Sequence, residues 1–160
     1  MPANWLEWVW LVPLLPLASA AVMLLAGSRL PRALISWLCC GTVGVSFLIS
    51  LKILQQLIEL PAGARVYEKV LFTWLPAGMF QTAAGALKEF RVEWGYLVDP
   101  LSAVMILVVS GVGFLIHVYS VGYMAHEGGY YRYFGYLNLF MFMMLTLVLA
   151  NNFLVMFVGW

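Results

Sequence analysis

The sequence contains very little charge. Only 9% of its 160 residues are Asp, Glu, Lys or Arg, whereas 64% are hydrophobic and the mean hydropathy is +0.96. A water-soluble domain usually carries about a quarter charged residues. This deficit excludes a soluble globular protein and predicts an integral membrane protein in contact with the lipid bilayer.

The low net charge, the few cysteines and the lack of a catalytic residue set exclude further classes of protein. The net charge is only +1, and no arginine-rich patch indicates a nucleic-acid partner. Cys39 and Cys40 are the only cysteines, and adjacent cysteines in an apolar run suit neither a metal site nor a disulfide framework. No serine, histidine and carboxylate set converges. We therefore predict no catalytic residue and no metal ligand on this chain.

Long apolar runs dominate what remains. About 20 apolar residues are needed to cross the hydrocarbon core of a bilayer. The runs that we interpret as transmembrane helices are residues 8–28, 33–57, 100–124 and 133–150. Asn151-Asn152 follows the last of them, and residues 153–160 have the composition of the start of a fifth span.

The third run contains the main candidate site. Asp99-Pro100 is typical of a helix start, so we predict that Asp99 is a helix cap. His117 is the one titratable side chain well inside the run. On a helical wheel one side of the helix carries the small and polar residues Ser102, Ser110, Gly113, His117 and Ser120. Such a stripe should face protein rather than lipid.

His117 has two interpretations that the sequence leaves open. Titratable groups inside membrane spans are rare and often functional, which makes His117 a candidate for a proton path. Alternatively, His117 is a neutral structural residue that bonds to a backbone carbonyl or a neighbouring hydroxyl.

The only long polar stretch lies between the second and third runs. Residues 70–75 are apolar and β-prone up to Pro76, and residues 90–94 alternate apolar and charged side chains with the period of a strand. We predict an extramembrane β-hairpin with a loose connection over residues 77–88. A flexible interhelical loop is the alternative.

The predicted hairpin suggests a contact surface for another subunit. Its candidate interface residues are Arg91, Glu93 and Trp94. Three regions follow along the chain: helices one and two in residues 1–59, the hairpin loop in 60–97, and the remaining helices in 98–160.

The predicted fold is an all-α membrane protein. It is a multi-span transmembrane helix bundle with about four full spans, the start of a fifth, and the β-hairpin between helices two and three. Because eight residues cannot cross a bilayer, we expect the chain to be a truncated piece of a larger protein. By itself it should pack poorly and move no protons.

The basic residues near the helix ends predict an orientation. Arg29 and Arg32 follow the first helix and nothing positive precedes it, so the positive-inside rule places the N-terminus outside. Arg132 would then be cytoplasmic. The basic residues of the long polar stretch argue the other way, but the rule is weaker for long loops.

Several motifs together resemble one family. They are Val98-Asp99-Pro100-Leu101-Ser102, His117-Val118-Tyr119-Ser120-Val121-Gly122-Tyr123-Met124, Tyr131-Arg132-Tyr133-Phe134 and Phe157-Val158-Gly159-Trp160. The chain resembles the N-terminal segment of the antiporter-like subunit L (chain 5) of respiratory complex I, the NADH-quinone oxidoreductase. The match is densest from about Phe90 onward.

The resemblance implies a function and its setting. It implies a proton-translocating subunit in the bacterial inner (plasma) membrane, with other membrane subunits of complex I as partners. NADH, flavin, iron–sulfur clusters and quinone are expected on partner subunits, and no cofactor is expected on this chain. The family's buried glutamate follows the Gly-Trp pair, so it is absent after Trp160. The large subunit of a multi-subunit sodium/proton antiporter and a non-transporting scaffold segment are the alternatives.

Overall fold

The computed structural model describes residues 4–81 and 87–160. Its long helices are α1 (Leu11–Ala26), α2 (Arg32–Glu59), α3 (Pro100–Tyr123) and α4 (Tyr130–Leu149), with the shorter α5 (Phe153–Gly159) and the 3₁₀ helices η1 (Trp5–Trp8), η2 (Gly27–Arg29) and η3 (Ala62–Ala64). In this described part, 4 helical segments are long and apolar enough to cross a membrane. The predicted multi-span helix bundle is confirmed.

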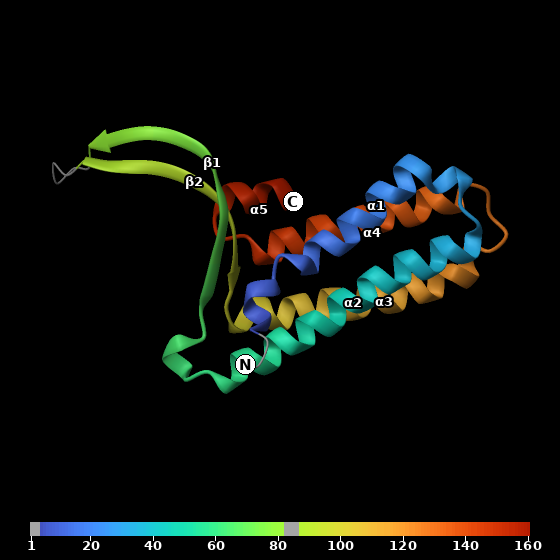
Figure 1. Cartoon of the computed structure of the whole chain (residues 1–160), viewed down its shortest axis with the longest axis horizontal. Helices are drawn as coiled ribbons and strands as arrows, with labels where there is room; N and C mark the ends of the chain where they lie inside the picture. Colours follow the sequence, from blue (N-terminus) through green and yellow to red (C-terminus); the bar gives the residue numbers. More distant parts are fainter. Residues whose placement is uncertain (1–3, 82–86) are drawn as a thin grey trace.

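The helices form an antiparallel bundle. α1 lies beside α4 and α2 lies beside α3, while the turns that join α1 to α2 and α3 to α4 share one end (Figure 1). The hairpin rises from the opposite end. At 1.5 Å per residue, the 20 residues of α4 are about 30 Å long, which matches the thickness of a bilayer core. The 16-residue α1 is extended by η1 and η2 into an apolar helical segment that runs from Trp5 to Arg29.

A proline in α1 determines how α1 contacts α2. Pro16 has no backbone N–H, so it cannot donate the helical hydrogen bond to the carbonyl of Val12. The Ser46 hydroxyl of α2 donates to that carbonyl instead, at 2.9 Å, and also lies 3.0 Å from the carbonyl of Thr42. Because lipid offers no donor, this contact between helices satisfies the exposed carbonyl.

Helix α3 starts and faces inward as its sequence suggests. The backbone N–H of Ser102 donates to Asp99 Oδ1 at 2.7 Å, and the Asp99 N–H donates to Ser102 Oγ at 2.8 Å, which together form a capping box. The predicted inward stripe is confirmed, because its members are all buried: Ser102, Ser110, Gly113, His117 and Ser120.

The β-hairpin is longer than the sequence predicts. β1 (Tyr67–Gln81) pairs with β2 (Leu87–Val98) in an antiparallel sheet. The prediction that β1 ends at Pro76 is wrong, because Pro76 pairs with Arg91 and the strand continues. In a two-stranded sheet one edge of each strand has no partner strand, so no backbone N–H is needed along that edge. The register shift between Pro76 and Met79 accommodates the remaining irregularity in strand pairing. Within the predicted connection, residues 82–86 lie outside the described residues.

The last two helices are joined by a short break. α4 begins at Tyr130, three residues before the predicted start, because Gly129 enters it with a left-handed φ of 83°. Asn152 Oδ1 accepts from the Val155 N–H at 3.0 Å and so caps α5. α5 then packs back onto α4, where a Cβ added to Gly159 would lie 2.7 Å from the backbone nitrogen of Leu147.

The contact between Ser46 and Val12 predicts a stability effect. Ser46→Ala should lower the free energy of unfolding in detergent by roughly 1 kcal/mol, because the Val12 carbonyl loses its donor. Unfolding with SDS, followed by tryptophan fluorescence, measures this change.

Two further variants isolate the cause. Ser50 is also buried but its hydroxyl donates within its own helix, at 2.8 Å to the carbonyl of Ser46, so Ser50→Ala is the matched control and should cost less. Pro16→Ala restores a backbone donor, so in that background Ser46→Ala should cost little. Equal losses with proline and alanine at position 16 would contradict this explanation.

Candidate functional site

His117 is fully buried in the C-terminal half of α3. Its Nδ1 lies 2.7 Å from the carbonyl oxygen of Gly113, one turn earlier in the same helix. A carbonyl only accepts hydrogen bonds, so Nδ1 carries the proton of that bond. In the neutral ring Nε2 then has a free lone pair. Nε2 has no hydrogen-bond partner within the described part of the chain, which leaves a base inside the bundle.

A cavity of about 240 Å³ adjoins His117 between α3 and α4. Apart from His117, its lining is apolar: Val108, Val109, Val112, Gly113, Ile116, Leu137, Phe140, Met141 and Met144. Gly113 allows Met141 to pack closely, because a Cβ at Gly113 would lie 2.5 Å from the Met141 sulfur. The Phe134 ring lies on another side, with its centroid 6.1 Å from that of His117. The imidazole is therefore the one titratable group at this cavity.

A buried hydrogen-bond network crosses three helices nearby in the bundle. Thr42 Oγ1 donates to Ser19 Oγ at 3.1 Å, and Ser19 Oγ donates to Asn138 Oδ1 at 2.8 Å. The Asn138 amide in turn donates to the carbonyl of Phe134 at 3.0 Å. These bonds join α2, α1 and α4 and hold Phe134, the neighbour of His117.

Sequence reasoning did not identify Asn138 as a site residue. The available signal was an amide side chain in the middle of an apolar run, which is as unusual as a histidine in that position. Its partner Ser19 is 119 positions away in the chain, so only the fold brings the two together.

The predicted interface residues of the hairpin have different surroundings. Trp94 packs inside the hairpin, stacked on Phe72 at 6.1 Å and edge-on to Trp74 at 5.4 Å between ring centroids. The carbonyl of Glu93 accepts from Asn152 Nδ2 at 2.6 Å. Arg91 is exposed and lines a small groove beside α5. The structure thus places Glu93 and Trp94 in intrachain contacts, and Arg91 is the most exposed of the three.

The break between α4 and α5 is where the hairpin joins the bundle. Asn151 Nδ2 donates to Glu68 Oε1 at 2.9 Å, and Tyr96 of β2 bridges to Ala150. A Cβ at Gly95 would lie 2.6 Å from Asn151 Nδ2, so only glycine permits this approach. Burial in this contact raises the pKa of the Tyr96 phenol.

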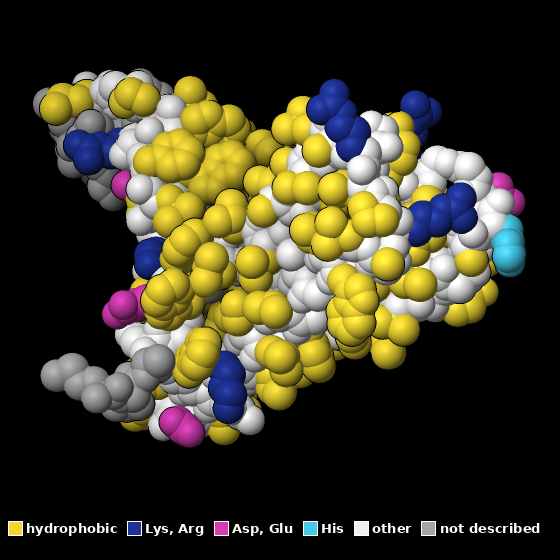
Figure 2. Space-filling view, turned by 45° about the vertical axis from the view of Figure 1, so that its right-hand side comes forward, with side chains coloured by type: hydrophobic (Ala, Val, Ile, Leu, Met, Phe, Trp, Pro, Cys, Tyr) yellow, Lys and Arg dark blue, Asp and Glu magenta, His cyan; other side chains and the backbone are white. Residues whose placement is uncertain are grey.

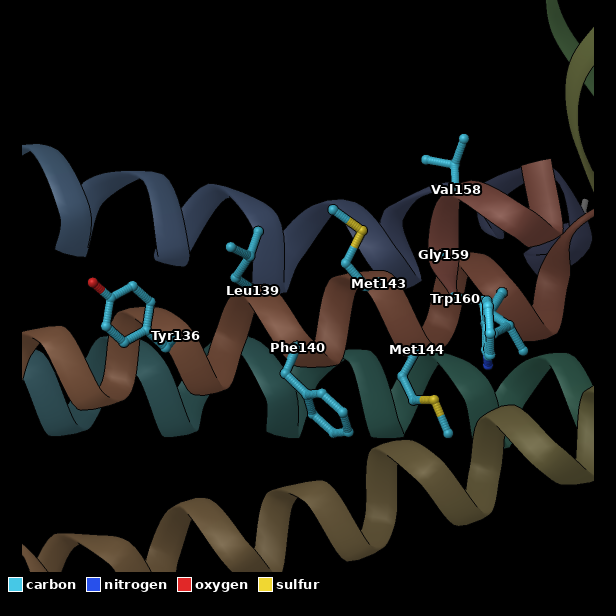
Figure 3. Close-up of a pocket in the computed structure, with 9 residues that line it drawn as sticks. Tyr136, Leu139, Phe140, Met143, Met144, Val158, Gly159 and Trp160 are labelled. Atoms are coloured by element: carbon cyan, nitrogen blue, oxygen red, sulfur yellow. The ribbon is translucent and has the colours of Figure 1, made fainter. Parts of the chain in front are cut away.

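A larger cavity, of about 550 Å³, lies between α4 and α5. Figure 3 shows its apolar lining, with the Tyr136 hydroxyl at one end and Trp160 at the other. The cavity has few polar groups, so it is better suited to packing against another apolar surface than to binding a polar ligand or to catalysis. Across residues 4–81 and 87–160, no group of three His, Cys, Asp or Glu side chains is placed to hold a metal ion.

The fold and its buried polar groups define a class, the multi-span membrane helix bundles. The family model described as "NADH-Ubiquinone oxidoreductase (complex I), chain 5 N-terminus" matches residues 85–134. The predicted resemblance to the N-terminal segment of the subunit L (chain 5) family is confirmed by this match and by the relatives described next.

The chain is similar to NADH-quinone oxidoreductase subunit L of Mycobacterium tuberculosis, with 39% identity over 96% of this chain and 23% of the relative. It is also similar to subunit L of Escherichia coli, with 35% identity over 92% of this chain and 22% of the relative. The chain therefore spans less than a quarter of the length of these relatives.

The fold is also found among solved structures. A chain in the structure of the Mrp complex from Dietzia superposes on 95% of this chain with a TM-score of 0.66 and 27% identity, and this match covers 14% of the Dietzia chain.

Proposed function

We propose that this chain is the N-terminal part of a proton-translocating membrane subunit of an NADH-quinone oxidoreductase. In that role it couples electron transfer from NADH to quinone to proton movement across the membrane. NADH, flavin, iron–sulfur clusters and quinone belong to partner subunits, and the contacts of this chain are with other membrane subunits. The similarity to subunit L over nearly the whole chain supports this assignment.

The observation that carries the proposal is that Nε2 of His117 has no hydrogen-bond partner in the part of the chain that the structure describes. A proton path across a membrane needs titratable groups that lipid alone would not tolerate. Nδ1 is held by the Gly113 carbonyl, so the ring orientation is fixed while Nε2 remains able to take up and release a proton. His117 thus provides one proton-binding group of the path, and the remaining titratable groups belong to other parts of the complex.

A second candidate function has its own support. The similarity to a chain of the Mrp complex favours a subunit of a multi-subunit sodium/proton antiporter, which would act without a redox partner. The two functions differ in their energy source. Proton movement that starts on addition of NADH supports the oxidoreductase, and movement driven only by an ion gradient supports the antiporter.

The role of His117 can be tested in membrane vesicles from cells that make the complete protein. His117→Ala and His117→Leu should reduce the number of protons pumped per NADH oxidised. A positioned proton-transfer group is worth roughly 10²- to 10⁴-fold in rate, so pumping through this path should fall to background. A pH-sensitive dye and NADH absorbance measure both quantities together.

The control for this test is Ser110→Ala. Ser110 is buried on the same face of α3, but its hydroxyl bonds within its own helix, to the carbonyl of Ile106 at 2.6 Å and to that of Leu107 at 3.4 Å. This variant should pump normally, and native gels should show assembled complex in all variants. Normal pumping by an assembled His117→Leu complex would show that the histidine is incidental.

The same proposal includes an orientation in the bacterial plasma membrane. The N-terminus and hairpin lie outside, and the ends of α1 and α3 lie in the cytoplasm, because Arg29 and Arg32 follow α1. In a chain with Cys39 and Cys40 replaced by alanine, Thr73→Cys on the hairpin should react with an impermeant thiol reagent added outside. Ser28→Cys should react only after permeabilisation, and the reverse pattern would overturn the orientation.

A further inference from the structure

A groove of about 320 Å³ runs between α2 and α3, and its lining residues are Ser36, Trp37, Cys40, Val118 and Val121. It opens to the outside of the bundle, since Trp37 is 80% exposed and Val118 is 50% exposed. Ser36 and Cys40 follow Arg32 by one and two helical turns, so the groove extends from about 6 to about 12 Å deeper than Arg32. Those depths correspond to the glycerol and upper acyl region of a leaflet.

The end of the bundle above this groove is positively charged. Two segments lie at this end, the two turns together with the first residues of α2 and α4: residues 27–33 and 124–133. They contain Arg29, Arg32 and Arg132 but only one acidic residue, Glu127. No salt bridge involves these arginines among the described residues. Figure 2 shows basic side chains at this end beside a flank covered by hydrophobic side chains.

Arg32 is held in place by neutral partners. Its guanidinium donates to the backbone carbonyls of Ala125 and Glu127 and lies 5.7 Å from the centre of the Tyr130 ring. Two of its five N–H donors are thereby used, and its positive charge stays uncompensated. A positioned guanidinium with free donors suits a phosphate group.

Aromatic side chains mark the depth of the headgroups on the neighbouring helix. The exposed rings of Tyr119 and Tyr123 stack at 5.9 Å on α3. Exposed tyrosine and tryptophan are enriched where the bilayer meets water. Together with Trp37, they place Arg32 at the level of lipid phosphates.

We propose that this groove binds one anionic phospholipid, with its phosphate on Arg32 and an acyl chain along Trp37, Cys40 and Val118. The apolar groove below a single uncompensated charge has the two-part chemistry of a lipid. Arg29 is three positions from Arg32, so its Cα lies at most about 11 Å away and adds to the local positive charge. A zwitterionic lipid would bring its own cation to this positive end, which favours an anionic headgroup.

Native mass spectrometry of the complete subunit that contains this chain, purified in detergent, tests this binding directly. The protein is titrated with phosphatidylglycerol, with phosphatidylcholine of the same acyl chains, and with glycerol 3-phosphate. We expect one phosphatidylglycerol to bind in preference to phosphatidylcholine, and glycerol 3-phosphate to bind only weakly because it has no acyl chain. Equal binding of the two lipids, or equally tight binding of glycerol 3-phosphate, would overturn the proposal.

Arginine variants test which basic side chain binds the lipid phosphate. Arg32→Gln should weaken phosphatidylglycerol binding roughly fivefold, the factor for one basic residue near an anionic surface. Arg132→Gln removes the same charge at the same end, but its guanidinium contacts Tyr131 away from the groove, so it should have a smaller effect. Arg32→Lys keeps the charge and should keep the preference. Equal losses in Arg32→Gln and Arg132→Gln would show a diffuse surface effect and refute the site.

Groove variants locate the acyl chain. Val118→Trp fills the groove and should weaken binding of both lipids, whereas Leu115→Trp, at an exposed position one turn earlier on α3 that does not line the groove, should not. Circular dichroism of each variant checks that the helices are intact. Unchanged binding by a folded Val118→Trp chain would contradict the proposal.

Discussion

The carbonyl of Val12 lacks the regular helical donor four residues later, because Pro16 occupies that position and has no backbone N–H. In a bilayer such a group must find a donor on another helix, and Ser46 of α2 provides it. Asn138, Ser19 and Thr42 meet the same requirement by bonding to one another and to the backbone. Since lipid does not favour one apolar face over another, these polar contacts decide which helix faces meet.

Among the described residues two buried side-chain atoms have no hydrogen-bond partner, Nε2 of His117 and Oγ1 of Thr146, and of these two side chains only the imidazole can accept a proton as a base. Ser46, Ser110 and Asn138 are satisfied within the described chain, whereas Nε2 of His117 is not. A buried group without a partner costs stability, so its presence needs a reason outside the packing of this bundle. Proton transfer supplies such a reason, because an imidazole nitrogen without a hydrogen-bond partner can accept and release a proton.

The features that repeat along the chain were predictable from the sequence. The lengths of the apolar runs predicted the positions of the transmembrane helices. The 3.6-residue period of a helix identified the buried face of α3 that contains His117. Contacts between distant residues were not predictable. The pairing of Ser19 with Asn138, the continuation of β1 past Pro76, and the docking of Glu93 on Asn152 each depend on a partner that only the fold brings near.

The central claim is that Nε2 of His117, which has no hydrogen-bond partner among residues 4–81 and 87–160, is a base that takes up and releases protons. Solid-state NMR of the chain in bilayers, with ¹⁵N-labelled histidine and with His126→Gln so that one histidine remains, measures this directly. We predict magnetisation transfer from water to Nε2 and none to Nδ1, which stays bonded to the Gly113 carbonyl. An Nε2 that exchanges no magnetisation with water and is coupled to a protein group would contradict the account.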